Sequence, residues 1–351
     1  MKKRSLVHIL VTVLFVITFG AFFSTNVQAD ESFFQPNTER VGVWWWDTSN
    51  LSLAHSESYL DYAKNNGITE IYLNQTDLRK INKFTVNDDP DVMKDVIVPT
   101  QNFIRAAKVY GIDVYFLLSN DGTWLYEHRR NNFNNIMQGF TIYQEISQDE
   151  ELFAGLHFNV EPNQLSDGAG GRYWDKGIPV QQELMQRLAN FAIYVNDTYG
   201  KNNEGEGSVI MWSTGYWWDR DEYTVDYNNK EELLYRVIIE ESDTTVVMSF
   251  RTSAYEMARF SRNHLAYARS VDKPIILSGT VILAGRLPHQ SAHAQFIAHG
   301  RERMHRELQN VPEAANLWSN RGNTASSLNE LDVHVAIHEM MTWRHWARRE
   351  R

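Results

Sequence analysis

The stretch that most constrains the fold is residues 152–162, Leu-Phe-Ala-Gly-Leu-His-Phe-Asn-Val-Glu-Pro. Apolar and polar side chains alternate along it, which is the period of a β-strand, and His157, Asn159 and Glu161 share one face. In a parallel barrel that face points into the interior, where polar groups are costly unless they serve a function. Pro162 ends the strand because it has no N–H for a ladder. Glu161 is therefore expected at the carboxyl end of the strand, where parallel barrels place their chemistry.

Seven further strand-like segments alternate with segments of helical spacing. Strands are expected at 41–46, 69–73, 112–118, 156–161, 208–213, 245–250, 274–277 and 333–337. This alternation predicts a single (β/α)8 barrel over residues 30–351, with enlarged loops at its carboxyl-terminal face. A long loop is expected from Pro312 to Asp332. The alternative is a doubly wound open sheet, but its first turn would be Gly-rich if it bound a nucleotide, and residues 47–50 are Asp-Thr-Ser-Asn.

The amino-terminal residues predict export. Lys2, Lys3 and Arg4 precede an apolar run over residues 6–23, and small residues lead to Ala29. This is the plan of a signal peptide over residues 1–29, so a secreted or periplasmic protein is expected. An uncleaved membrane anchor is the alternative. Cleavage would remove three positive charges and change the net charge from −10 to −13.

Composition excludes several function classes. The chain has no cysteine, which excludes disulfides, thiolate nucleophiles and thiolate metal sites. Its negative charge disfavours nucleic acid and anionic membrane surfaces as partners. His334 and His338 have no obvious third ligand, so no metal is expected, and no cofactor motif is present. The oligomeric state is left open.

Polar side chains and tryptophans follow the predicted strands. Flat aromatic faces stack on sugar rings, and amides and carboxylates bond to hydroxyls, so this rim predicts a polysaccharide or oligosaccharide partner. The alternative is that the tryptophans are core residues and the carboxylates cap helices. The candidate residues are Trp44, Trp46, Asp47, Asn74, Asp121, Trp124, His157, Asn159, Glu161, Tyr216, Trp217, Trp218, Asp219, Arg251, His338, Glu339 and Trp343.

Residues 154–161 resemble the fourth strand of chitinase-type glycoside hydrolases. In that superfamily the strand has the pattern Asp-Gly-x-Asp-x-Asp-x-Glu, and its last residue is the general acid. Glu161 occupies that position, whereas His157 and Asn159 stand where the family has Asp. The related endo-β-N-acetylglucosaminidases carry an Asn-x-Glu pair, which residues 159–161 resemble. Residues 337–339, with Trp343, are also similar to the end of the eighth strand in secreted bacterial barrels of this superfamily.

The resemblance implies a glycoside hydrolase in which Glu161 protonates the leaving oxygen. An apolar environment, such as Trp44, Trp46 and Trp212 would supply, is expected to raise its pKa. Asn159 would orient a substrate acetamido group; otherwise Asp47, Asp121, Asp219 or Glu339 would be the second carboxylate. The alternative is a non-catalytic glycan-binding barrel with a degenerate hydrolase site, because both strand-four Asp residues are replaced.

Overall fold

The computed structural model describes residues 38–48, 51–82, 90–202, 204–282, 295–320 and 331–349. The predicted signal peptide, residues 1–29, lies outside the described residues. Across the described ranges, no helix is both long enough and apolar enough to cross a membrane.

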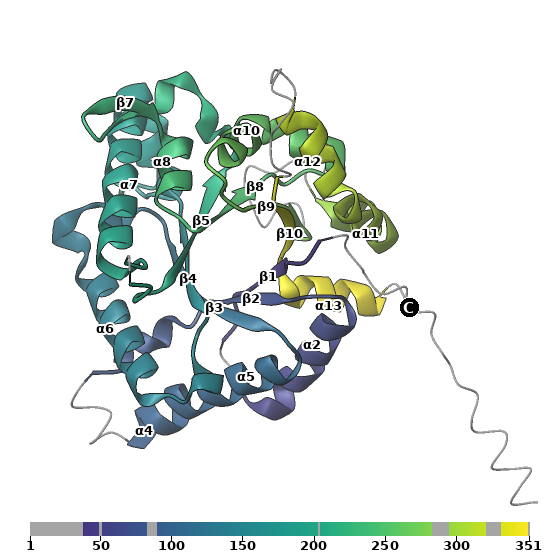
Figure 1. The fold of residues 1–351 in the computed structure, drawn as a ribbon. Helices are drawn as coiled ribbons and strands as arrows, with labels where there is room; N and C mark the ends of the chain where they lie inside the picture. The colour runs from purple at the N-terminus through teal and green to yellow at the C-terminus, as the bar shows by residue number, and fades with distance from the viewer. Residues whose placement is uncertain are drawn as a thin grey trace, which may run out of the picture. The chain divides into compact units, whose positions relative to one another are not determined.

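Eight parallel strands close into a barrel, with each strand paired to the next one in the series and the last paired to the first. Figure 1 shows these strands at the centre, with the helices around them. The closed sheet confirms the predicted (β/α)8 fold and excludes the open sheet. The barrel strands are β1 (Val41–Trp45), β2 (Glu70–Leu73), β3 (Asp113–Asn120), β4 (Gly155–Val160), β5 (Val209–Gly215), β8 (Thr244–Met248), β9 (Ile275–Thr280) and β10 (Val333–His338).

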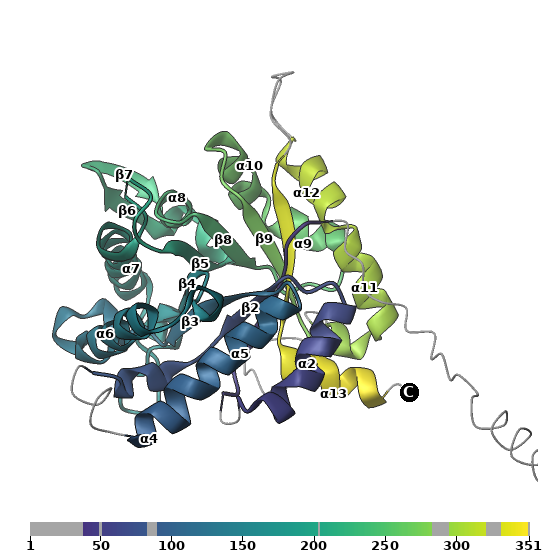
Figure 2. The same ribbon diagram turned by 60° about the horizontal axis from the view of Figure 1, so that its bottom comes forward.

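The helices cover the outer face of the barrel, as Figure 2 shows from a second direction. In α7, for example, Leu184, Leu188 and Val195 are buried at helical spacing, so one stripe of the helix packs inward. The helices of the described ranges are α2 (Leu53–Asn65), α4 (Pro90–Val92), α5 (Val98–Val109), α6 (Asn131–Ile146), α7 (Ile178–Tyr199), α8 (Leu234–Glu240), α9 (Ala254–Phe260), α10 (Arg262–Ser270), α11 (Arg301–Gln309), α12 (Val311–Ser319) and α13 (Met340–Arg349). A π-helical turn, Met93–Ile97, joins α4 to α5.

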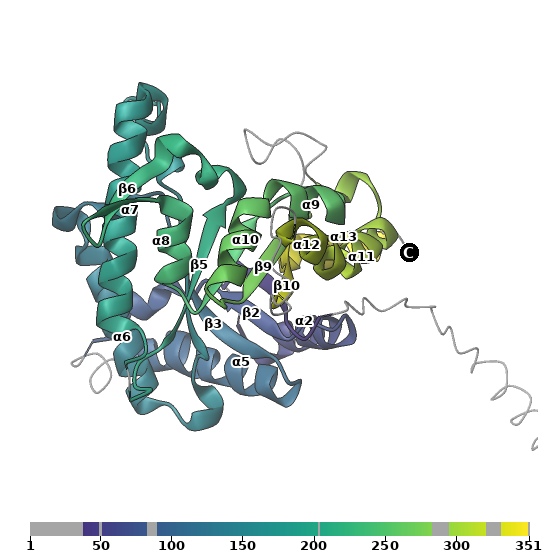
Figure 3. The ribbon, with the colours of Figure 1, turned by 45° about the horizontal axis from the view of Figure 1, so that its top comes forward.

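Two elements differ from the sequence-based expectation. The loop expected from Pro312 onward begins as helix α12, because proline is tolerated in the first turn of a helix, where its missing N–H has no partner to lose. A hairpin of β6 (Thr224–Tyr227) and β7 (Lys230–Leu233) also precedes α8. Figure 3 shows this hairpin beside α7 and α8.

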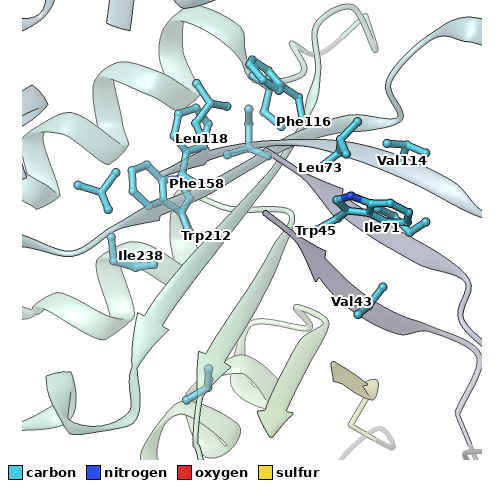
Figure 4. Packing of buried hydrophobic residues seen from close by; sticks show 14 of the residues in the cluster. Val43, Trp45, Ile71, Leu73, Val114, Phe116, Leu118, Phe158, Trp212 and Ile238 are labelled. Atoms are coloured by element: carbon cyan, nitrogen blue, oxygen red, sulfur yellow. The ribbon is translucent and has the colours of Figure 1, made fainter. Parts of the chain in front are cut away.

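The outward faces of the strands form the main hydrophobic core with the helices. Figure 4 shows Trp45, Phe116, Phe158 and Trp212 in this layer, and all four are fully buried. Trp212 stacks on Phe158 with ring centroids 4.9 Å apart. Trp212 therefore lies on the outside of the barrel, and its expected contribution to the environment of Glu161 is wrong.

The interior is filled by side chains from alternate strand positions. Toward the amino-terminal end, buried Glu70 accepts hydrogen bonds from Arg40 Nε at 2.5 Å and from the Tyr72 hydroxyl at 3.0 Å. Burial raises the pKa of Tyr72, so its hydroxyl stays protonated and remains a donor. The Tyr72 ring also meets the ring of Trp44 edge to face, with centroids 5.1 Å apart. The amino-terminal half is thus packed, and the polar row of β4 continues toward the carboxyl end.

Candidate functional site

His157 is the innermost member of the polar row on β4. Its side chain is 0% exposed, and its Nε2 lies 2.8 Å from Ser213 Oγ of β5. The rings of Tyr72 and Trp44 flank it at 4.3 and 5.7 Å. Burial lowers the pKa of His157 to about 3, so the ring is neutral at neutral pH. The side chain lies inside the barrel and exposes no surface to a substrate in this structure.

Asn159 is the next residue outward and is 4% exposed. Its Nδ2 donates to Glu161 Oε1 at 3.3 Å. Its Oδ1 is buried and has no hydrogen-bond partner within the described part of the chain. Leaving a buried acceptor unsatisfied costs about 1–3 kcal/mol, and such atoms in folded proteins need an explanation. A ligand N–H or O–H donor would satisfy this one.

Glu161 follows β4 directly and is partly exposed. Its Oε2 accepts a hydrogen bond from Gln164 Nε2 at 2.6 Å, at the end of the 3₁₀ turn η6 (Pro162–Gln164). Burial raises the pKa of Glu161, and the side-chain amides of Gln164, Asn159 and Asn163 oppose that rise. A carboxyl group with a raised pKa is suited to general acid catalysis near neutral pH.

Trp46 and His338 lie together where β1 and β10 end. Trp46 Nε1 donates to His338 Nε2 at 3.0 Å, which assigns the ring proton to Nδ1, 3.4 Å from Thr280 Oγ1. Phe250 stacks on His338 with centroids 5.5 Å apart. Burial lowers the pKa of His338 to about 3, so it is a neutral imidazole. Trp46 and His338 remain partly exposed, whereas Trp44 beneath them is buried and presents no ring face to a sugar, contrary to expectation.

Asn74 and Asp47 complete this side of the barrel. Asn74 follows β2, is partly exposed, and has a buried Oδ1 without a partner within the described residues. Asp47 is exposed just after β1. The side-chain oxygens of Asn74 and Asn159, both at the carboxyl-terminal face of the barrel, are therefore available to accept hydrogen bonds from a ligand.

The loops after β4 and β5 hold a second group of aromatic residues. Trp174 lies in the 3₁₀ turn η7 (Tyr173–Lys176), and its ring is 5.3 Å from that of Trp217 in η8 (Tyr216–Asp219). Both are partly exposed. Arg251 donates to the Tyr216 hydroxyl at 2.7 Å, and its guanidinium lies 4.6 Å above the Tyr216 ring. Trp174 was not a candidate from the sequence, because its position in a long loop gave no sign that it meets Trp217.

Three predicted rim tryptophans are core residues instead. Trp124, Trp218 and Trp343 are at most 2% exposed and pack into the main hydrophobic core. In this structure their rings present no face to a sugar. The sequence places these tryptophans near strand ends but does not say which way their rings point.

Glu339, Asp121 and Asp219, which the sequence offers as second carboxylates, have hydrogen-bond partners near their own elements. Glu339 is 8% exposed and caps α13, because its carboxylate accepts from the backbone N–H groups of Met341 and Thr342. Both carboxylate oxygens of this predicted catalytic residue thus accept hydrogen bonds from the start of the helix. Asp121 Oδ1 accepts from the Thr123 N–H at 3.2 Å, and Asp219 accepts from Asn263 of α10 at 2.8 Å. Burial raises the pKa of Asp219.

No group of three His, Cys, Asp or Glu side chains in the described ranges is arranged to hold a metal ion.

No family model and no curated protein sequence match the chain. Solved structures do align with it. A class V chitinase from Nicotiana tobaccum is 10% identical over 87% of this chain and 99% of that chain, with a TM-score of 0.41. A Cellulomonas fimi endo-β-1,4-mannanase double mutant is 10% identical over 88% of this chain and 70% of that chain, with a TM-score of 0.47. An endo-β-N-acetylglucosaminidase from Cordyceps militaris is 10% identical over 86% of this chain and 81% of that chain, with a TM-score of 0.39.

Proposed function

We propose that this protein is a glycoside hydrolase that acts on an N-acetylhexosamine-containing glycan, with Glu161 as its general acid. The observation that carries the proposal is the Asn159–Glu161 pair, in which a carboxyl group of raised pKa adjoins a buried amide oxygen without a partner. The pair lies at the carboxyl end of β4, where barrels of this architecture carry out their chemistry.

Asn159 would orient the substrate in this reaction. Its Oδ1 would accept the N–H of a 2-acetamido group, which increases electron density on the acetamido carbonyl oxygen and directs it at the anomeric carbon. As a bond forms between these two atoms, the glycosidic bond breaks and its oxygen takes the proton of Glu161. Water then attacks the anomeric carbon, whose bond to the acetamido oxygen breaks, and gives a proton back to Glu161. This step restores both the acetamido group and the acid.

A glycan without an acetamido group would need a second carboxylate in place of that nucleophile. Asp47 is the candidate for this role, since it is exposed directly after β1. Trp46, Trp217 and Trp174 are the partly exposed aromatic rings proposed to stack on sugars. Export by the amino-terminal segment would place the enzyme outside the cell or in the periplasm, where polysaccharides are accessible.

The test compares wild type with Glu161→Gln on chitin oligosaccharides and on their deacetylated counterparts, scored by new reducing ends. The substitution keeps the side-chain shape and removes the transferable proton, so activity is expected to fall about 10²–10⁴-fold while the thermal unfolding midpoint stays the same. Equal hydrolysis by both proteins would exclude Glu161 as the acid. Equal cleavage of acetylated and deacetylated substrate by wild type would exclude the acetamido route.

A non-catalytic glycan-binding barrel is the second candidate. The observation that favours it is that His157 and Asn159, where the resembled family has Asp, supply no negative charge, since His157 is neutral inside the barrel. Binding of a glycan by wild type and by Glu161→Gln with equal affinity, without new reducing ends in either case, would support this function over the enzyme.

A further inference from the structure

The two carboxylate oxygens of Glu161 are held unequally. Oε1 accepts a long hydrogen bond of 3.3 Å from Asn159 on the same strand, whereas Oε2 accepts a short one of 2.6 Å from Gln164. The turn η6 fixes the position of Gln164, since Pro162 begins it and the Gln164 N–H donates to the Glu161 carbonyl at 2.9 Å. Gln164 is itself exposed, so the core does not require it.

This asymmetry affects where a proton can be placed. A protonated carboxyl oxygen is a poorer acceptor than an ionised one, so the short bond from Gln164 disfavours protonation at Oε2. When Glu161 is protonated, the proton is therefore favoured on Oε1, the oxygen nearer Asn159.

The groups that act on the Glu161 carboxyl within the described residues are uncharged. Its pKa responds to burial and to the amides of Gln164, Asn159 and Asn163. Among the titratable groups of neighbouring elements, His157 bonds to Ser213, Asp121 to Thr123, Arg172 to Asp175, Lys176 to Asp167, and Tyr216 to Arg251. Changing Gln164 therefore changes one direct influence on Glu161 without breaking an ion pair.

We propose that Gln164 is a positioning residue that holds Oε2 of Glu161 as a hydrogen-bond acceptor and leaves Oε1, beside Asn159, to carry the proton that is transferred. This inference rests on the proposed function, in which Glu161 is the acid. It extends that function by assigning one of the two oxygens to the reaction and a residue to its control.

The first test titrates Glu161 without substrate. The carboxyl is followed by ¹³C NMR of glutamate-labelled protein or by infrared difference spectra, with Glu161→Gln identifying the signal. Gln164→Met removes the donor at similar size, so the pKa of Glu161 is expected to rise. Gln164→Lys places a cation beside the carboxylate, so that pKa is expected to fall. Gln182→Met, at an exposed position on α7, is the matched control and should leave the titration unchanged.

A structural role alone predicts no shift, or shifts of the same sign, in the two Gln164 variants, and either result would overturn the proposal. The second test is kinetic, on chitin oligosaccharides. Gln164→Met should lower kcat about tenfold with KM within about twofold, and should extend the active range to higher pH, because the acid stays protonated there. The two proposals can fail separately. Unchanged hydrolysis by Glu161→Gln would exclude the proposed function, whereas the titration requires no turnover and tests the role of Gln164 alone.

Discussion

At the residue scale, the partners of a carboxylate decide which chemistry is open to it. Glu339 and Glu161 both follow a barrel strand, but Glu339 is bonded to backbone N–H groups at a helix start and Glu161 to side-chain amides. Backbone donors at a helix N-terminus use the carboxylate as a cap. Amides on a partly buried carboxyl hold its orientation, while burial favours the protonated form. Only the second arrangement suits an acid.

Asn159 gives the prediction that belongs at this scale. Asn159→Asp keeps an oxygen that can accept an acetamido N–H, and its charge should raise the pKa of Glu161 further; Asn159→Ala removes the acceptor. We expect the Asp variant to retain some hydrolysis of N-acetylated oligosaccharides and the Ala variant to lose most of it, measured by new reducing ends. If the two variants are equally impaired, with no dependence on the acetyl group, Asn159 does not orient the acetamido group.

At the element scale, the alternation of strand-like segments with segments of helical spacing is enough to predict the barrel. It does not predict which side chains are buried or which contacts they make. The period-two pattern of β4 correctly predicts that His157 and Asn159 point into the barrel, since side chains of a strand point to one face of the sheet or the other. It could not show that His157 would be sealed in. Pro312 was mistaken for a loop because proline both ends helices and begins them. Gln164 was missed because its contact with Glu161 depends on the turn at Pro162, which a residue pattern does not fix.

The packing of α6 against the chain after β2 gives a second prediction. Gly139 lies in mid-helix, where Gly→Ala normally stabilises by about 1 kcal/mol. Here an added Cβ would meet the Leu78 carbonyl oxygen at 1.9 Å, which is backbone and cannot rotate away. Such overpacking typically costs about 1–3 kcal/mol, so it outweighs the propensity gain.

We therefore expect Gly139→Ala to lower the free energy of unfolding measured in urea. Gln138→Ala, the exposed neighbour on the same helix, is the control and should change stability little. A stabilised Gly139→Ala protein would mean that α6 lies farther from Leu78 than in this structure.

At the scale of the whole molecule, buried histidines make stability depend on pH. Burial lowers the pKa of His157 and His264 to about 3. In the unfolded chain a histidine has a pKa of about 6.5, so below that pH the unfolded state binds more protons than the folded state. Their contribution is fully present above pH 6.5 and is lost progressively as the pH falls from about 6.5 toward about 3. A slightly acidic environment should thus weaken the whole barrel, including parts far from Glu161.

His264 isolates this effect, because it is remote in role from Glu161 and Asn159. It is 0% exposed in α10, its ring lies 4.7 Å from that of Tyr235, and neither ring nitrogen has a hydrogen-bond partner within the described residues. His264→Phe therefore loses no hydrogen bond and keeps the aromatic contact, so stability at pH 7.5 should stay within about 1 kcal/mol of wild type. Between pH 7.5 and 5.0, wild type should lose about 2 kcal/mol more than the variant, since each buried neutral histidine contributes roughly that amount over this range. Urea unfolding at the two pH values measures the difference, with His128→Phe, an exposed imidazole, as the control. If wild type and His264→Phe lose the same unfolding free energy between these pH values, the prediction is wrong. His264 would then be protonated as easily in the folded chain as in the unfolded one, despite its burial beside Tyr235.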